Sequence, residues 1–143
     1  MIPPIAKRMP GIPASSRAVD QRLVSKRYDA PKSTVHVVRM LGDEQGYRFE
    51  PANLTVQQGD SVRFLLVSGG PHNVAFDSTA IPAGATERLA ATMPAQIAPL
   101  MGAMLLNAGE TYTLSFDGMP PGAYPYQCTP HLAMNQRGII TVR

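Results

Sequence analysis

Residues 32–143 consist of short segments in which apolar and polar side chains alternate, separated by turns rich in glycine and proline. In residues 61–67, for example, Val62, Phe64 and Leu66 occupy every second position, which is the period of a strand with one buried face. Similar segments lie at 34–40, 46–50, 53–57, 72–76, 112–116, 124–128 and 139–142. Seven or eight short strands of this kind predict an all-β fold, a two-sheet Greek-key β-sandwich.

Residues 80–108 interrupt the alternation. Pro99 stands where a helix could begin, and the apolar residues after it fall at helical spacing. These residues are Leu100, Met101, Met104 and Leu105. The segment is therefore expected to form one short helix or an irregular insert within the sandwich.

The charge is concentrated at the start of the chain. Residues 1–31 carry six basic and two acidic side chains, whereas residues 32–143 carry seven basic and eight acidic ones. This composition predicts a flexible, basic N-terminal extension over 1–31 followed by one domain over 32–143. The domain lacks the basic patch with interleaved aromatic residues that nucleic-acid binding needs, so no nucleic-acid partner is expected. No apolar run is long enough to predict a transmembrane segment.

Cys128 is the only cysteine, so an internal disulfide is excluded. Its thiol is either a small buried hydrophobe or a chemically used thiolate. The alternation in 124–128 turns the sulfur toward the core, and His131 follows in the loop before the last strand. His72 lies on the inward face of its own strand, after a Ser-Gly-Gly-Pro turn. His36 has no metal-binding companion beside it and is interpreted as a structural histidine.

Two imidazoles and one thiolate, with a weak fourth ligand, are typical of a blue-copper electron-transfer site. Structural zinc prefers four strong ligands, usually with more cysteines, and only three strong ligands are available here. The residues thus predict one type 1 copper ion bound by His72, Cys128 and His131.

The chain also resembles the cupredoxins, most closely the pseudoazurin, plastocyanin and amicyanin group, over roughly residues 33–143. The motifs that carry the resemblance are Phe49-Glu-Pro, Gly59-Asp60, His72-Asn73 and Tyr126-Gln-Cys-Thr-Pro-His. In that family the histidine of His-Asn, the cysteine and the following histidine bind copper. The resemblance further implies that Asn73 and Thr129 hydrogen-bond across the two ligand loops and hold them together.

The resemblance leaves two candidates for the axial ligand. Amicyanin-like loops place the ligating methionine three residues after the histidine, which selects Met134, whereas pseudoazurin-like and plastocyanin-like loops place it five residues after, which selects Gln136. Gln136 is preferred, because Gly138 and the last strand then fall into register. An axial glutamine occurs in stellacyanin-like proteins, and its oxygen favours Cu(II), so the reduction potential should be lower than in a methionine-ligated relative.

These features predict a one-electron carrier and not an enzyme, since the chain has three histidines and no visible nucleophile–base pair. A copper carrier or resistance protein, with Met93, Met101 and Met104 as soft ligands, is the first alternative. A sandwich without copper that serves only for protein contact is the second. The resemblance implies a periplasmic or extracytoplasmic location, and redox partner proteins are expected to dock near His131 and Leu132 on a monomer.

Overall fold

A computed structural model describes residues 33–143, and the basic extension predicted over 1–31 lies outside these residues. The described chain forms two four-stranded sheets packed face to face. The strands are β1 (Val35–Asp43), β2 (Gly46–Glu50), β3 (Asn53–Val56), β4 (Ser61–Leu66), β5 (Ala75–Phe76), β6 (Thr111–Ser115), β7 (Gly122–Gln127) and β8 (Arg137–Val142). The predicted all-β sandwich is confirmed.

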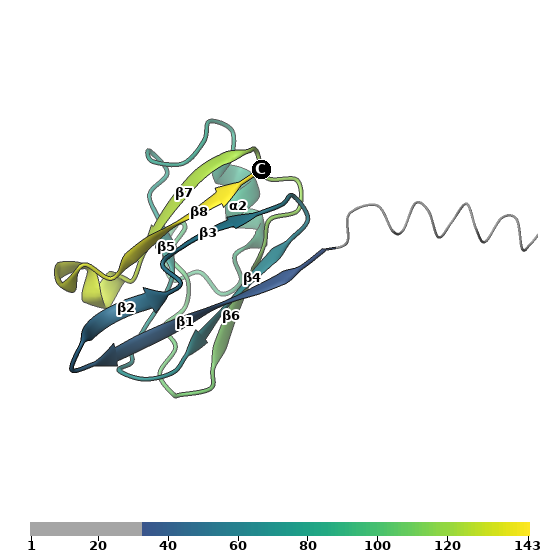
Figure 1. The fold of residues 1–143 in the computed structure, drawn as a ribbon. Helices are drawn as coiled ribbons and strands as arrows, with labels where there is room; N and C mark the ends of the chain where they lie inside the picture. The colour runs from purple at the N-terminus through teal and green to yellow at the C-terminus, as the bar shows by residue number, and fades with distance from the viewer. Residues whose placement is uncertain (1–32) are drawn as a thin grey trace, which may run out of the picture. The chain divides into compact units, whose positions relative to one another are not determined.

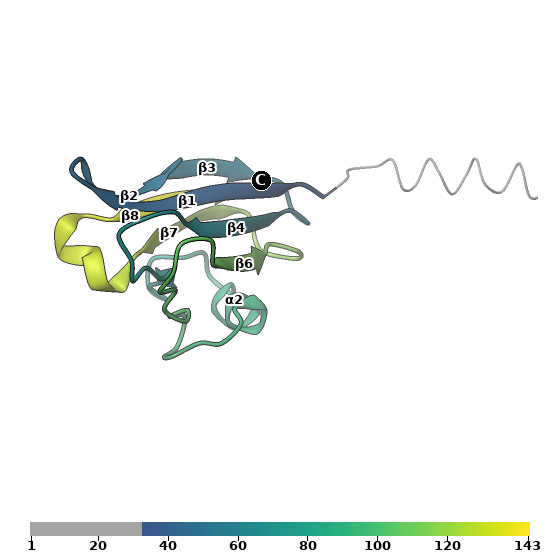
Figure 2. The same ribbon diagram turned by 90° about the horizontal axis from the view of Figure 1, so that it is seen from below.

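The two sheets have the strand orders β2-β1-β4-β6 and β3-β8-β7-β5. Most neighbours are antiparallel, but β1 pairs with β4 and β3 pairs with β8 in parallel. Figures 1 and 2 show the β1–β2 turn and the β7–β8 connection at the same end of the sandwich. That end carries the candidate metal centre.

The alternating positions predicted to face inward do form the core. Val62, Phe64 and Leu66 of β4 are at most 2% exposed, as are Tyr124 and Tyr126 of β7. The aromatic rings of Phe49, Phe64 and Tyr126 meet edge to face, which is a favourable arrangement for aromatic pairs. This core fixes the ends of the strands from which the site loops emerge.

The insert at 80–108 contains a short helix, but not where the apolar spacing placed it. Helix α2 spans Thr86–Thr92 and buries Leu89, while 99–105 is irregular and bridges to the backbone of His72 and Ala75. Leu100 has a positive φ of 58°, and a Cβ at Gly102 would collide with the ring of Tyr112. Tertiary packing thus overrides the helical spacing of 99–105. Within residues 33–143, no helix is long and apolar enough to cross a membrane.

Pro125 lies inside β7, a position where proline removes one ladder hydrogen bond. On one side β7 pairs with β8, where Pro125 faces Ile139. On the other side β5 pairs only with Tyr126 and Gln127 and reaches no further. Pro125 therefore has no β5 neighbour, which explains why the strand tolerates it.

Asp60 ties together the end of the sandwich opposite the ligand loops. Its carboxylate is buried and accepts hydrogen bonds from the backbone N–H groups of Thr34 and Gln57 and pairs with the His36 ring, each at 2.9 Å. Burial raises the pKa of Asp60, but the hydrogen bonds from His36, Gln57 and Thr34 outweigh burial and leave it below its ordinary value. His36 thus has the structural role expected for it, although the sequence did not reveal Asp60 as its partner.

We predict that Asp60→Asn lowers the free energy of unfolding of the metal-free protein by about 1–3 kcal/mol at neutral pH, because the amide cannot satisfy all three contacts. Since the folded-state pKa is depressed, the stabilisation is present above the ordinary carboxyl pKa and is lost as pH falls through the lowered one. Denaturant unfolding at several pH values measures both effects. The exposed Asp117→Asn serves as the control, and equal behaviour of the two variants would contradict the prediction.

Candidate metal centre

The predicted ligands come from three places at one end of the sandwich. Cys128 directly follows β7 and starts a 3-10 segment over Thr129–Met134 that contains His131. Gln136 immediately precedes β8, and its carbonyl accepts a hydrogen bond from the N–H of Cys128 at 3.0 Å. His72 follows the turn after β4 and exchanges two backbone hydrogen bonds with Leu105. The short strand expected at 72–76 is thereby reduced to Ala75–Phe76.

Asn135 reverses the chain between the 3-10 segment and β8. It adopts the left-handed conformation, with φ 65° and ψ 33°, and its N–H donates to the carbonyl of Leu132. Asparagine tolerates this conformation better than most residues. The turn brings Gln136 back into the interior, where its side chain is fully buried. The sequence analysis did not anticipate this short helical segment.

The ring and sulfur atoms of the three strong candidates converge at a buried point. The Cys128 Sγ lies 3.8 Å from the Nδ1 of His72 and 3.5 Å from the Nδ1 of His131. All three ligand atoms lie within 4.8 Å of one another, and none of the residues is more than 5% exposed. With metal–nitrogen and metal–sulfur distances of about 2.0–2.1 and 2.3 Å, a tetrahedral-to-trigonal site has N–S edges of about 3.6–3.8 Å. The residues therefore fit a bound metal ion of this size.

The pattern of hydrogen bonds also turns electron pairs of His72 and Gln136, and not their protons, toward the centre. The Nε2 of His72 lies 2.7 Å from the carbonyl oxygen of Ser68, and the Nε2 of Gln136 lies 3.1 Å from that of Arg48. Because a carbonyl oxygen can only accept, both contacts require an N–H donor. The neutral His72 ring then presents an unprotonated Nδ1, 3.1 Å from the Gln136 Oε1. Two acceptors that face each other in a buried pocket are stabilised by a cation that binds both of them.

Burial dominates the electrostatics of the cluster. It lowers the pKa of His72, so this imidazole stays neutral and available as a ligand. It raises the pKa of the Cys128 thiol, while the backbone N–H groups of Asn73 and His131 act in the opposite direction. Metal binding must therefore displace the thiol proton, and the thiolate formed is then stabilised by the metal.

The two axial candidates lie in different surroundings. The Oε1 of Gln136 lies 2.9 Å from the His131 Nδ1 and 3.1 Å from the His72 Nδ1, within the cluster. Met134 is 50% exposed at the surface of the 3-10 segment. The geometry thus brings Gln136 to the other three residues and leaves Met134 outside the buried cluster.

Asn73 connects the two ligand loops, although not through the Thr129 hydroxyl. The Asn73 Oδ1 accepts from the backbone N–H of Thr129 at 2.7 Å, and its Nδ2 donates to the carbonyl of Gly102 at 3.2 Å. The Thr129 Oγ1 is buried and has no hydrogen-bond partner within residues 33–143. The expected cross-loop contact is present, and the part of Thr129 that makes it is the main chain.

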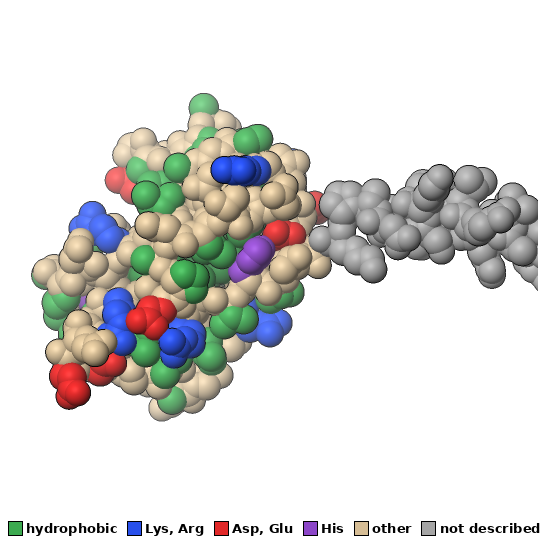
Figure 3. Space-filling view, viewed as in Figure 1, with side chains coloured by type: hydrophobic (Ala, Val, Ile, Leu, Met, Phe, Trp, Pro, Cys, Tyr) green, Lys and Arg blue, Asp and Glu red, His purple; other side chains and the backbone are tan. Residues whose placement is uncertain are grey.

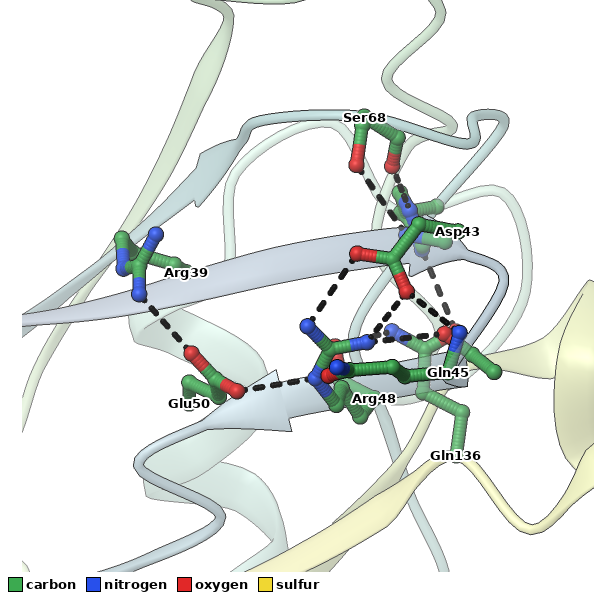
Figure 4. A network of polar contacts seen from close by, with 10 residues as sticks. Arg39, Asp43, Gln45, Arg48, Glu50, Ser68 and Gln136 are labelled. Carbon is green, nitrogen blue, oxygen red and sulfur yellow. Dashed lines mark hydrogen bonds and ion pairs between the residues drawn. The ribbon is translucent and has the colours of Figure 1, made fainter.

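The β1–β2 hairpin contributes contacts that the sequence analysis missed. The Tyr47 ring stacks on His131 with centroids 3.7 Å apart, and the Arg48 carbonyl accepts from Gln136. The Arg48 guanidinium in turn bonds to Asp43 and Glu50, as Figure 4 shows. The only sign of this role in the sequence is that residues 46–48 lie beside a turn expected between two strands. The contact from Arg48 is made by its backbone carbonyl, so the residue type does not reveal it.

A buried cluster of two imidazoles and one thiolate, held by the loops of a β-sandwich, is typical of a cupredoxin-type copper protein. Comparison with known proteins agrees with this class. Residues 36–143 match the family of copper binding proteins described as plastocyanin/azurin. The chain belongs to this family, and copper is its metal.

Individual relatives show the same relationship. The chain is 34% identical to plastocyanin from Scenedesmus fuscus over 107 residues, covering 74% of this chain and 97% of that one. It is 38% identical to plastocyanin from Dryopteris crassirhizoma over 104 residues, covering 72% and 96%. The solved oxidised form of the Dryopteris crassirhizoma protein superposes with a TM-score of 0.56, covering 75% and 99% of the chains. A pseudoazurin from Sinorhizobium has a TM-score of 0.50 at 32% identity, covering 77% and 74%.

We predict that Asn73→Ala lowers the free energy of unfolding of the metal-free protein by about 1–3 kcal/mol, because it leaves the Thr129 N–H and the Gly102 carbonyl unpaired. Thr129→Val should cause no such loss, since the hydroxyl it removes has no partner among the described residues. Denaturant unfolding of both variants checks this contrast. A larger loss for Thr129→Val than for Asn73→Ala would refute the assignment.

Proposed function

We propose that the protein is a one-electron carrier that uses a single type 1 copper ion bound by His72, Cys128 and His131, with Gln136 as the axial ligand. The main supporting observation is the buried convergence of these four side chains, whose N–S distances of 3.5 and 3.8 Å are close to those of a tetrahedral-to-trigonal metal site. When bound, copper supplies reversible exchange between Cu(II) and Cu(I). Residues 32–143 form the functional domain in this proposal, and residues 1–31 form an extension to it.

The chain's own contribution is to hold the ligands in place in both oxidation states. His72 is fixed through Ser68, Gln136 through the Arg48 carbonyl, and the two ligand loops through Asn73. A site that rearranges little on electron transfer has a low barrier to that transfer. Burial also excludes water from the thiolate, which restricts side reactions at the sulfur.

Delivery of copper as cargo is less well supported. A delivery protein needs exposed, exchangeable ligands, whereas His72 and Cys128 are fully buried and His131 is 5% exposed. Met93 is 4% exposed within the hydrophobic core, while Met101 and Met104 are half-buried. The burial of the complete ligand set favours retention of the metal and transfer of electrons.

The partner in this proposal is another redox protein that docks at the end of the sandwich near His131. Leu132 is half-buried there, and Met134 is 50% exposed. Close approach with weak, brief contact suits such an exchange. Basic and acidic side chains are interspersed over the face drawn in Figure 3 and form no patch of one sign there.

We further propose that the protein is not an enzyme, acts as a monomer and works in the periplasm or another extracytoplasmic compartment.

Copper loading tests the proposal directly. Addition of Cu(II) to the metal-free protein should produce an intense blue thiolate-to-copper absorption band that ascorbate bleaches reversibly without loss of copper. Any Cu(II) bound by Cys128→Ser should lack that band, because the thiolate is its source. A colourless wild-type protein, or release of copper on reduction, would contradict the electron-carrier function.

The axial ligand is tested by a matched pair of variants. Gln136→Met should raise the reduction potential and shift the copper hyperfine splitting, because a thioether binds Cu(II) less strongly than an amide oxygen. Met134→Leu should leave both quantities unchanged. Voltammetry and electron paramagnetic resonance measure them, and a response of Met134→Leu with none of Gln136→Met would reverse the assignment.

A further inference from the structure

The two histidines of the cluster are oriented in different ways. His72 donates from Nε2 to the Ser68 carbonyl at 2.7 Å, the usual second contact that fixes the ring of a ligating histidine. The polar contacts of the His131 ring all involve Nδ1, with Cys128 and Gln136. Within residues 33–143, no protein group hydrogen-bonds to its Nε2. The orientation of His131 therefore needs another support.

Tyr47 occupies the position of that support. Its ring lies nearly parallel to the His131 ring, with an interplanar angle of 17° and centroids 3.7 Å apart. This approach is closer than the roughly 4.5–7 Å usual for aromatic pairs. The stack covers one face of the imidazole, so the His131 ring cannot tilt toward Tyr47 without a clash.

The β1–β2 hairpin itself provides the space that the Tyr47 ring occupies. A Cβ at Gly42 would lie 2.6 Å from two carbons of the Tyr47 ring, so only glycine leaves room for the ring there. The Gly42 N–H donates to the Ser68 hydroxyl at 3.3 Å, and the Ser68 carbonyl contacts His72. Tyr47 is thus held between the backbone of β1 and the imidazole of His131.

We propose that Tyr47 is a positioning residue that sets the orientation of the His131 ring, in the role that the Ser68 carbonyl has for His72. The inference rests on the proposed function only in taking His131 as a metal ligand. The β1–β2 hairpin then supports three of the four ligands, since it also binds Gln136 through the Arg48 carbonyl and anchors Ser68 through Gly42. The supporting element lies outside both ligand loops.

Cobalt(II) is a suitable probe, because its spectrum reports coordination geometry without electron transfer. The experiment titrates Co(II) into wild type, Tyr47→Phe and Tyr47→Leu, recording the thiolate-to-cobalt band and the visible ligand-field bands. Tyr47→Phe keeps the ring and should match wild type. Tyr47→Leu should keep the thiolate band but change the ligand-field bands and bind Co(II) roughly 2- to 10-fold more weakly, the loss expected from one aromatic pair.

The outcomes separate this inference from the proposed function. If wild type gives no thiolate-to-cobalt band, the ligand assignment fails, and with it the basis for the role of Tyr47. If wild type gives the band and Tyr47→Leu equals it in affinity and ligand-field spectrum, the positioning role is overturned. A Tyr47→Phe variant that behaves like Tyr47→Leu also overturns it, because the hydroxyl and not the stacked ring would then matter. Denaturant unfolding of each metal-free variant confirms that it is folded.

Gly42→Ala tests the space for the ring independently. The added methyl group should displace Tyr47 and weaken Co(II) binding in the same direction as Tyr47→Leu. Because both changes act through one ring, the double variant should bind no more weakly than Tyr47→Leu alone. Fully additive losses would show that Gly42 acts by another route and would overturn this part of the inference.

Discussion

The metal centre depends on keeping the electron pairs of His72 and Gln136 at one buried point while their N–H protons point away. Two backbone carbonyls accomplish much of this. The Ser68 carbonyl accepts the Nε2 proton of His72, and the Arg48 carbonyl accepts an amide proton of Gln136. Without these acceptors the ring and the amide could each turn over, and an N–H would face the metal position. The chemistry of the site is therefore set by main-chain oxygens that hold no metal.

Those carbonyls are placed by the sheets. Arg48 lies in β2, where pairing with β1 sets it opposite Leu41. Ser68 follows β4, and its N–H donates to the Met40 carbonyl of β1. A residue that is hydrogen-bonded to a neighbouring strand moves less than a residue in a free loop. The pairing register of the strands thus determines how the candidate ligands are oriented. Burial of the cluster also raises the free-energy cost of any unpaired polar atom within it.

The sequence predicted the parts of this structure that follow from local periodicity and residue chemistry. The alternation in 61–67 and 124–128 predicted the inward faces, and the types and spacing of His72, Cys128 and His131 predicted the cluster. The helix at Thr86–Thr92 was missed because it buries a single leucine, whereas the stronger helical spacing of 99–105 was overridden by bridges to His72 and Ala75. The Tyr47 stack depends on Gly42 being close in space, which no local pattern reveals.

The axial ligand that we propose, Gln136, connects this support to function. Gln136 is buried with both ends of its amide engaged, Nε2 on Arg48 and Oε1 toward the two imidazoles. A thioether in its place could occupy the volume but could not donate to the Arg48 carbonyl, which would lose its partner in a buried setting. In the proposed site the amide therefore serves two purposes, as the oxygen donor toward copper and as a link between Gln136, next to β8, and the β1–β2 hairpin. The same hairpin carries Tyr47, so the position of Gln136 and the orientation of the His131 ring are coupled through one structural element. A substitution that moves one of them is therefore expected to move the other.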